Sequence, residues 1–247
     1  MQTETIEVHA DGARLVCRCY VDDARPGRRP GVLVAPEAFG LSAHAYDVAH
    51  RLAEAGYAAL ALDYYGDAAY LDMATCMPRV GAFMAAPDTL RARAAAGLAA
   101  LAAQPLTDPT RLAAIGYCFG GTTALELARS GADLKAVVGF HSGLTAPRPA
   151  DAKAIRAKVL VCIGAADPVI PPAQRAAFET EMTDAGVDWR MILYGGVGHS
   201  FTNPEVGALG NPAFAYDASA DHRSWRAMVD LFDEAFGPPQ DAIPGAG

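Results

Sequence analysis

Short apolar segments alternate along this chain with longer segments in which apolar positions recur at helical spacing. The short segments carry no regular polar positions, which is typical of strands that are covered on both faces of a parallel sheet. They span residues 32–35, 58–63, 112–117, 136–140, 159–164 and 191–196. The intervening pattern predicts helices over residues 42–55, 88–103, 122–130, 172–185 and 222–236.

The ends of these elements carry their own signals. Ser42 and Asp88 are expected to cap helix N-termini, and glycines at positions 56, 131 and 186 lie where helices should end. Two extended segments, 3–8 and 14–20, flank the turn pair Asp11-Gly12 and predict a hairpin at the edge of the sheet. The fold class is therefore α/β, as one domain over residues 1–247 with helices on both faces of a mostly parallel, twisted sheet. The tail over 236–247 is expected to be loose.

The segment 66–87 interrupts the alternation, because its apolar residues follow no clean period. A loop of that length in a compact domain is usually functional, often as a lid over a site. The other interpretation is an irregular helix packed over the sheet. The sequence leaves both open.

Charge and cysteine content narrow the class of protein. The formal net charge is −8 with acids and bases interspersed, which argues against nucleic acid or an anionic membrane as a partner. No signal peptide is visible, and the longest apolar run, about 94–103, is too short and alanine-rich to span a bilayer. Five cysteines match neither a disulfide framework nor a zinc pattern, so we expect a reduced, cytoplasmic protein without a metal site.

The stretch Gly116-Tyr117-Cys118-Phe119-Gly120 contains the most distinctive chemistry of the chain. Glycine on both sides of a nucleophile permits a tight turn from strand to helix, and it places the side chain of Cys118 at a helix N-terminus. The helix dipole there favours a thiolate. An isolated cysteine is more often a buried structural residue, but the glycine frame after a buried strand favours a nucleophile.

Two further residues follow in the order that such an elbow requires. Asp167 comes directly after the predicted strand 159–164, and His199 comes directly after the last predicted strand. An acid and then a histidine at these places complete a nucleophile–histidine–acid triad with Cys118. His9, His44, His50 and His222 fall on the edge hairpin or on helices and are expected to be solvated or half-buried. His141 follows the strand 136–140, so it lines the pocket or packs behind it.

Four segments together resemble the dienelactone hydrolase family of the α/β-hydrolase superfamily. They are VLVAPEAFGL (32–41), RLAEAGYAALALDYYG (51–66), IGYCFGG (115–121) and GHSF (198–201). The likeness runs from about residue 30 to 235. It implies hydrolysis of an ester or enol-lactone by Cys118, His199 and Asp167, without a cofactor, and a regulatory Glu37 near the resting thiol.

The chain departs from the family where an arginine binds the carboxylate of a dienelactone. Thr202-Asn203-Pro204 follows the histidine motif, and no arginine occurs before Arg223. Arg79 is the only basic residue between Leu52 and Leu90. Since a guanidinium is hard to replace in such a role, ester or lactone hydrolysis is predicted without a specific dienelactone substrate.

The predicted mechanism is attack of the Cys118 thiolate on a carbonyl carbon. The backbone N–H groups of Phe119 and Ala38 are expected to form the oxyanion hole. The expected substrate is a small, partly apolar ester or lactone, and the protein is expected to be a monomer or a small homo-oligomer. The predicted pocket residues are Phe39, Tyr64, Tyr65, Arg79, His141, Phe201 and Asn203. Two alternatives remain: a broad carboxylesterase or thioesterase, and a non-catalytic relative that binds a ligand or responds to oxidation through Cys118.

Overall fold

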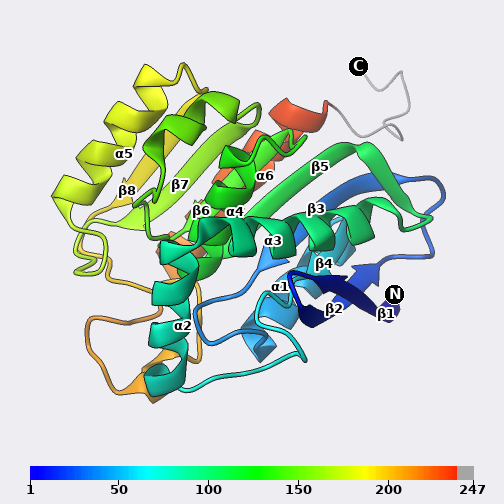
Figure 1. Ribbon diagram of the computed structural model, residues 1–247, viewed down its shortest axis with the longest axis horizontal. Coiled ribbons are helices and arrows are strands. Elements are labelled where there is room, and N and C mark those ends of the chain that lie inside the picture. The colour runs from blue at the N-terminus through cyan, green and yellow to red at the C-terminus, as the bar shows by residue number, and fades with distance from the viewer. Residues whose placement is uncertain (238–247) are drawn as a thin grey trace.

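A mostly parallel sheet of eight strands forms the centre of the computed structural model, which describes residues 1–237 (Figure 1). The strand order is β1-β2-β4-β3-β5-β6-β7-β8, and only the pairings of β2 with β1 and β4 are antiparallel. The central strands are buried on both faces, as their continuous apolar runs predict. The strands are β1 (Gln2–Ala10), β2 (Ala13–Val21), β3 (Arg29–Ala35), β4 (Ala58–Ala61), β5 (Thr107–Tyr117), β6 (Ala136–Phe140), β7 (Lys158–Gly164) and β8 (Trp189–Tyr194).

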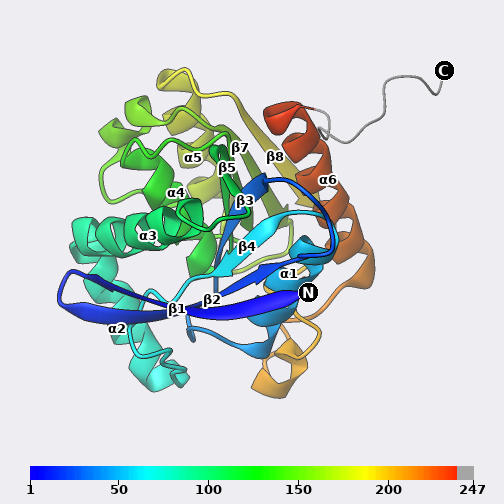
Figure 2. The ribbon, with the colours of Figure 1, turned by 90° about the vertical axis from the view of Figure 1, so that its right-hand side faces the viewer.

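Helices cover both faces of this sheet (Figure 2). One core contains side chains of α3 (Pro87–Ala102), α4 (Phe119–Arg129) and α5 (Pro172–Asp184). The core on the opposite face contains side chains of α1 (Ala43–Glu54) and α6 (Ala218–Phe236). Two short 3₁₀ turns, η1 (Pro149–Ala154) and η2 (Val206–Leu209), lie in the loops. The three-layer α/β architecture predicted from the alternating pattern is therefore confirmed.

The edge hairpin and most of the helix ends also agree with the sequence. β1 forms the edge of the sheet, and Asp11 and Gly12 make its turn with positive φ. Ser42 caps α1 by accepting a hydrogen bond from the Ala45 N–H. The prediction for Asp88 was wrong, because α3 begins one residue earlier at Pro87. Asp88 lies in the first turn, where it pairs with Arg148 at the surface.

The segment 66–87 forms a helix over most of its length. α2 (Met73–Ala85) begins after Asp72, whose carboxylate accepts a hydrogen bond from the Thr75 N–H at 2.8 Å. Pro78 lies inside this helix, which explains the irregular sequence pattern. α2 projects away from the sheet rather than covering its face (Figure 1). Of the two interpretations, the helix is confirmed, but it does not pack over the sheet. One side of α2 instead lines a cavity.

Three further expectations concern the C-terminal tail, membrane-spanning helices and the state of the cysteines. Phe236 ends α6, and the remainder of the predicted loose tail beyond Gly237 lies outside the described residues. Across residues 1–237 we find no helix with the length and hydrophobicity that a membrane span requires. The five cysteines, all within that range, are free thiols.

Candidate active site

Cys118 lies at a sharp turn between β5 and α4. Its backbone has φ 53° and ψ −118°, a conformation that L-residues rarely adopt. The glycines around it have no room for a side chain: a Cβ on Gly116 would lie 2.0 Å from the Gly120 carbonyl oxygen, and one on Gly120 would lie 2.1 Å from that of Ala35. The half-buried thiol consequently stands at the N-terminus of α4, as the glycine frame predicts.

His199 and Asp167 meet although they are 32 positions apart in the chain. Nδ1 of His199 lies 2.7 Å from the Asp167 Oδ2, and both side chains are buried. The second oxygen of Asp167, Oδ1, accepts hydrogen bonds from the backbone N–H groups of Val169 and Ile170. Since a carboxylate accepts, Nδ1 carries the proton and Nε2 is directed toward the cavity.

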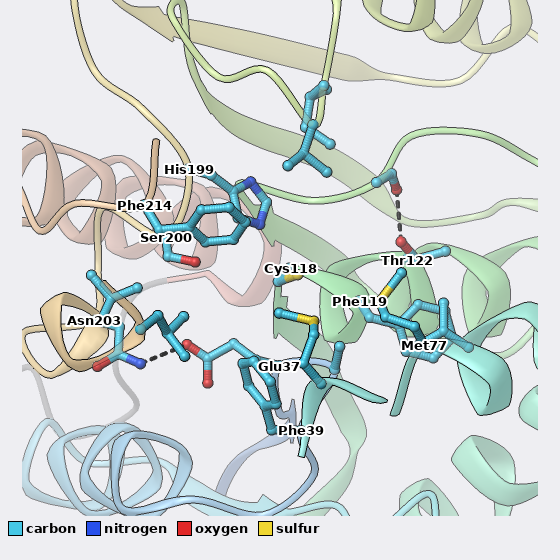
Figure 3. A pocket seen from close by; sticks show the side chains of 18 of the residues that line it. Glu37, Phe39, Met77, Cys118, Phe119, Thr122, His199, Ser200, Asn203 and Phe214 are labelled. Atoms are coloured by element: carbon cyan, nitrogen blue, oxygen red, sulfur yellow. Dashed lines mark hydrogen bonds between the residues drawn. The ribbon is translucent and has the colours of Figure 1, made fainter. Parts of the chain in front are cut away.

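The Nε2 atom of His199 and the Cys118 thiol face the same cavity (Figure 3). Nε2 has no hydrogen-bond partner of suitable geometry among residues 1–237. Burial by itself would lower the pKa of His199, but the charge of Cys118 and the hydrogen bond to Asp167 outweigh it and raise that pKa to about 10. The imidazole is therefore strongly basic and placed to hold a proton taken from the thiol.

The backbone N–H groups of Ala38 and Phe119 lie at the cavity that contains the Cys118 thiol. Within the described part of the chain, neither the Ala38 nor the Phe119 N–H donates a hydrogen bond. Ala38 follows β3 and Phe119 is the first residue of α4, so the two donors come from neighbouring strand ends. Both residues line the cavity that contains the thiol. The oxyanion hole that these two groups would form stays a prediction.

The predicted pocket residues Tyr64 and Tyr65 do not line the cavity. Both are buried, and their hydroxyl groups donate to the carbonyl oxygens of Glu37 and Ala38. Asp63 holds the turn that carries them, because its carboxylate accepts hydrogen bonds from four backbone N–H groups. The tyrosines thus fix the loop that supplies the Ala38 N–H. Sequence reasoning missed this role because an aromatic residue after a strand fits a pocket wall equally well.

Glu37 lines the cavity, but its carboxylate is held away from the thiol. Oε1 accepts hydrogen bonds from His44 Nδ1 and Asn203 Nδ2, each at 3.0 Å. Burial alone would raise the pKa of Glu37, but these hydrogen bonds and the His44 charge outweigh it and hold that pKa below its ordinary value. Glu37 and Cys118 line the same cavity, and no hydrogen bond joins the two side chains, so a regulatory role of Glu37 stays a prediction. His44 was expected to be solvated or half-buried and is instead the buried partner of this carboxylate.

His141 and Phe201 pack behind the site and do not line the cavity. Nδ1 of His141 accepts from the Cys118 N–H at 3.2 Å, so Nε2 carries the proton and donates to Thr202 Oγ1 at 2.8 Å. Burial lowers the pKa of His141 well below its ordinary value, which keeps the ring neutral. Of its two predicted roles, packing is the one observed.

The cavity encloses about 410 Å³ and is walled mainly by apolar side chains. Phe39 and Asn203 line it as predicted, whereas Arg79 is exposed on α2 and lies 5.6 Å from the Tyr65 ring. The apolar walls that the sequence analysis did not identify are Met73, Met77, Val80, Met84, Val169, Ile170, Val206, Leu209 and Phe214. The four on α2 recur at helical spacing, a signal that Pro78 obscures. No group of three or more potential metal-ligating side chains occurs in residues 1–237.

The sheet order, the turn at Cys118 and the His199–Asp167 pair define an α/β-hydrolase fold. More specifically, the chain belongs to the dienelactone hydrolase family, whose sequence profile matches residues 18–236. The family membership predicted from the sequence is thus confirmed, and with it the assignment as a carboxylic ester hydrolase of the dienelactone hydrolase type.

Two solved structures and a curated relative illustrate the likeness. A dienelactone hydrolase-like promiscuous phosphotriesterase, P91, from metagenomic libraries, has a TM-score of 0.92 and 44% identity, covering 95% of this chain and 98% of its own. A structure named m3DLH has a TM-score of 0.90 and 46% identity, covering 94% of this chain and 98% of its own. A Bradyrhizobium protein named "Probable 2-oxo-3-(5-oxofuran-2-ylidene)propanoate lactonase" is 30% identical over 72% of this chain and 77% of its own length.

Proposed function

We propose that the protein hydrolyses esters or lactones through a thioester on Cys118, with His199 and Asp167 completing a catalytic triad. The observation that carries this proposal is the hydrogen-bonded His199–Asp167 pair, whose free Nε2 faces the same cavity as the thiol at the strained turn. The nucleophile, the base and the group that orients the base are thereby within one site.

In the acylation step, His199 Nε2 takes the thiol proton and the Cys118 sulfur attacks the carbonyl carbon. The carbonyl oxygen becomes an oxyanion between the Ala38 and Phe119 N–H groups. As the intermediate collapses, the C–O bond breaks, and the alcohol leaves with the proton from His199. Asp167 keeps the imidazole in one tautomer and stabilises its charged form.

In the deacylation step, water loses a proton to His199 Nε2 and attacks the thioester carbonyl. The C–S bond then breaks, which releases a carboxylic acid and regenerates the resting pair. A thiolate is a good leaving group, so the first intermediate returns to substrate unless the other leaving group is also good. Enol esters, aryl esters and activated lactones meet this condition, and amides do not.

Substitution of Cys118 tests the proposal directly. We expect Cys118→Ala to lower kcat/KM for p-nitrophenyl acetate by at least about a thousandfold, because the covalent route is lost. Cys118→Ser should retain only a small remnant. In wild type, acid quenching during turnover should trap an acyl group on Cys118, detectable by mass spectrometry.

Cys19→Ala is the matched control, since Cys19 lies on β2, which β4 and β3 separate from β5, and it does not line the cavity. Retained turnover in Cys118→Ala would overturn the proposal. Rapid alkylation of Cys118 in a wild-type protein without hydrolytic turnover would overturn it too, in favour of a non-catalytic, oxidation-responsive relative. Rates with p-nitrophenyl acetate, an acyl-CoA and a dienelactone separate a specific lactonase from a broad carboxylesterase or thioesterase.

Phosphotriester hydrolysis is a second candidate reaction. The structural relative at 44% identity is described as a promiscuous phosphotriesterase, and no arginine or lysine lines the cavity of this chain among its described residues. A neutral triester with an aryl leaving group resembles an aryl ester in charge and leaving-group quality. The same Cys118 variants assayed with diethyl 4-nitrophenyl phosphate decide whether that reaction uses this site.

A further inference from the structure

We infer that the site selects uncharged esters with an apolar group and discriminates against esters that carry a carboxylate. This inference rests on the proposed function, because it specifies the substrate of the same cavity. Three features of the cavity support it: the negative charge at its wall, the hydrogen bonds and neutrality of its other polar side chains, and the apolar face of α2.

Among residues 1–237, the only charged side chain that lines the cavity besides the proposed triad is that of Glu37, an anion. Glu37 is buried and its pKa lies below the ordinary value, through the hydrogen bonds and the charge described above, so it is ionised at neutral pH. No lysine or arginine lines the cavity within residues 1–237. The positive charge of a protonated His199 is balanced by the Asp167 carboxylate at 2.7 Å. A substrate carboxylate would therefore meet a like charge and lose water without gaining a partner.

Five uncharged polar side chains line the wall besides the proposed triad, and three of them are hydrogen-bonded within the protein. The Thr122 hydroxyl donates to the Gly143 carbonyl, and Gln174 accepts from the Leu144 N–H, each at 2.8 Å. Asn203 donates to Glu37 and accepts from the Glu205 N–H (Figure 3). The other two, Thr145 and Ser200, carry neutral hydroxyl groups. None of the five supplies a positive charge to a charged substituent, and the rest of the wall is mainly apolar surface.

α2 supplies that apolar surface along one side of the helix. Met73, Met77, Val80 and Met84 are spaced four, three and four residues apart, so their side chains share one face, and that face lines the cavity. Met73 and Met77 are about half exposed and extend the apolar wall to the mouth. Methionine adapts its shape to different ligands, which suits aryl or branched alkyl groups of varied outline.

A pair of substrates that differ in charge tests the inference. In methyl 4-acetoxybenzoate and 4-acetoxybenzoate, the same acetyl group is transferred to the enzyme and a phenol leaves, and only the second substrate carries a carboxylate. Each kcat/KM is divided by the rate constant of alkaline hydrolysis, because the methyl ester makes its phenol the better leaving group. We expect kcat/KM to favour the neutral compound by about tenfold or more at pH 7 and low ionic strength. A ratio near one, or one that favours the anion, would overturn the inference, while the proposed function would stand if both reactions depend on Cys118.

Met77→Arg provides the complementary test, because Met77 lies at the exposed mouth and its replacement spares the core. The added cation should raise kcat/KM for 4-acetoxybenzoate by about tenfold relative to the neutral ester. Met77→Gln, similar in length but uncharged, should leave the ratio unchanged. The inference would also be overturned if Met77→Gln changed the ratio as much as Met77→Arg. Failure of the wild-type protein to hydrolyse either compound would count against the proposed function itself.

Discussion

Backbone strain at single residues marks the site. Cys118, His141 and Ser200 all have positive φ, at 53°, 41° and 58°, although none is glycine. Cys118 and His141 each lie directly after a buried strand, and Ser200 follows His199 in the loop after β8, here called the histidine loop. His141 is hydrogen-bonded both to the Cys118 N–H and to Thr202 of that loop. Such conformations persist only where surrounding contacts enforce them. His141 is therefore a positioning residue that joins the nucleophile turn to the histidine loop.

Tyr64 has an equally specific positioning role. Its hydroxyl donates to the Glu37 carbonyl, which belongs to the same peptide group as the Ala38 N–H. Because a trans peptide is planar with its C=O and N–H opposed, this bond sets the direction of the proposed oxyanion donor. Tyr64→Phe should lower kcat by about tenfold to a hundredfold and leave KM within about twofold, since the oxyanion exists only after attack.

Tyr65→Phe is the comparison variant, because its hydroxyl binds the next carbonyl, of Ala38, outside that peptide group. It should reduce kcat less than Tyr64→Phe does. A general packing defect could also lower kcat. The thermal unfolding of both variants is therefore measured alongside their kinetics. If Tyr64→Phe retained the wild-type kcat, the assigned role of the hydroxyl would be wrong.

At the level of elements, a buried ion pair ties the loop after β3 to α1. His44 lies in the first turn of α1 and contacts Glu37 at 3.0 Å. Burial alone would lower the pKa of His44, but the hydrogen bond and charge of Glu37 outweigh it and raise that pKa. The loop that provides Glu37 and Ala38 is thus held by α1 on one side and by the two tyrosines on the other.

His44→Leu should therefore destabilise the protein by about 3 kcal/mol, because it leaves the Glu37 charge with Asn203 alone. The raised pKa of His44 means that its contribution is full below about pH 6.5 and is lost as pH rises through the folded-state value. The lowered pKa of Glu37 means that its contribution is present above about pH 4.5 and is lost at lower pH. In urea unfolding, the difference in the free energy of unfolding between wild type and His44→Leu should be largest between about pH 4.5 and about pH 6.5.

The added substitution Glu37→Gln in the His44→Leu protein removes the unpaired charge and should restore part of the lost stability. A pH-independent difference between wild type and His44→Leu would show that packing, and not the ion pair, is responsible.

Prediction from sequence succeeded where a local pattern determines an element. The apolar runs located the core strands, and the glycines around Cys118 predicted its turn, because steric constraints there are local. It was wrong where several conformations satisfy one pattern. The tyrosines after β4 and His44 on α1 were assigned by position along the chain, whereas their roles depend on partners, Glu37 and Ala38, in the loop after β3. For His141 the sequence left two roles open, because its partner Thr202 is 61 positions away.

On the scale of the whole molecule, buried charges join the helices on one face of the sheet. Glu126 of α4 is fully buried and accepts from Arg91 of α3 and from Arg129. Arg129 also contacts Glu181 of α5 through two hydrogen bonds. Three helices that pack over the central strands are therefore connected through two carboxylates and two guanidinium groups. No local sequence pattern reveals the links between helices, because Arg91 is 35 positions from Glu126 and Arg129 is 52 positions from Glu181.

Glu126→Gln tests the contribution of this network while preserving the side-chain shape. Two buried arginines lose the charge between them, so the free energy of unfolding should fall by about 3 kcal/mol. For a protein of this size that corresponds to a drop in Tm of roughly 10 °C. The exposed pair Lys135–Asp133 offers the control: Asp133→Asn removes one charge from water and should change stability by less than about 1 kcal/mol. If the two variants lost similar stability, the buried network would contribute no more than a surface pair, and packing alone would hold the three helices to the sheet.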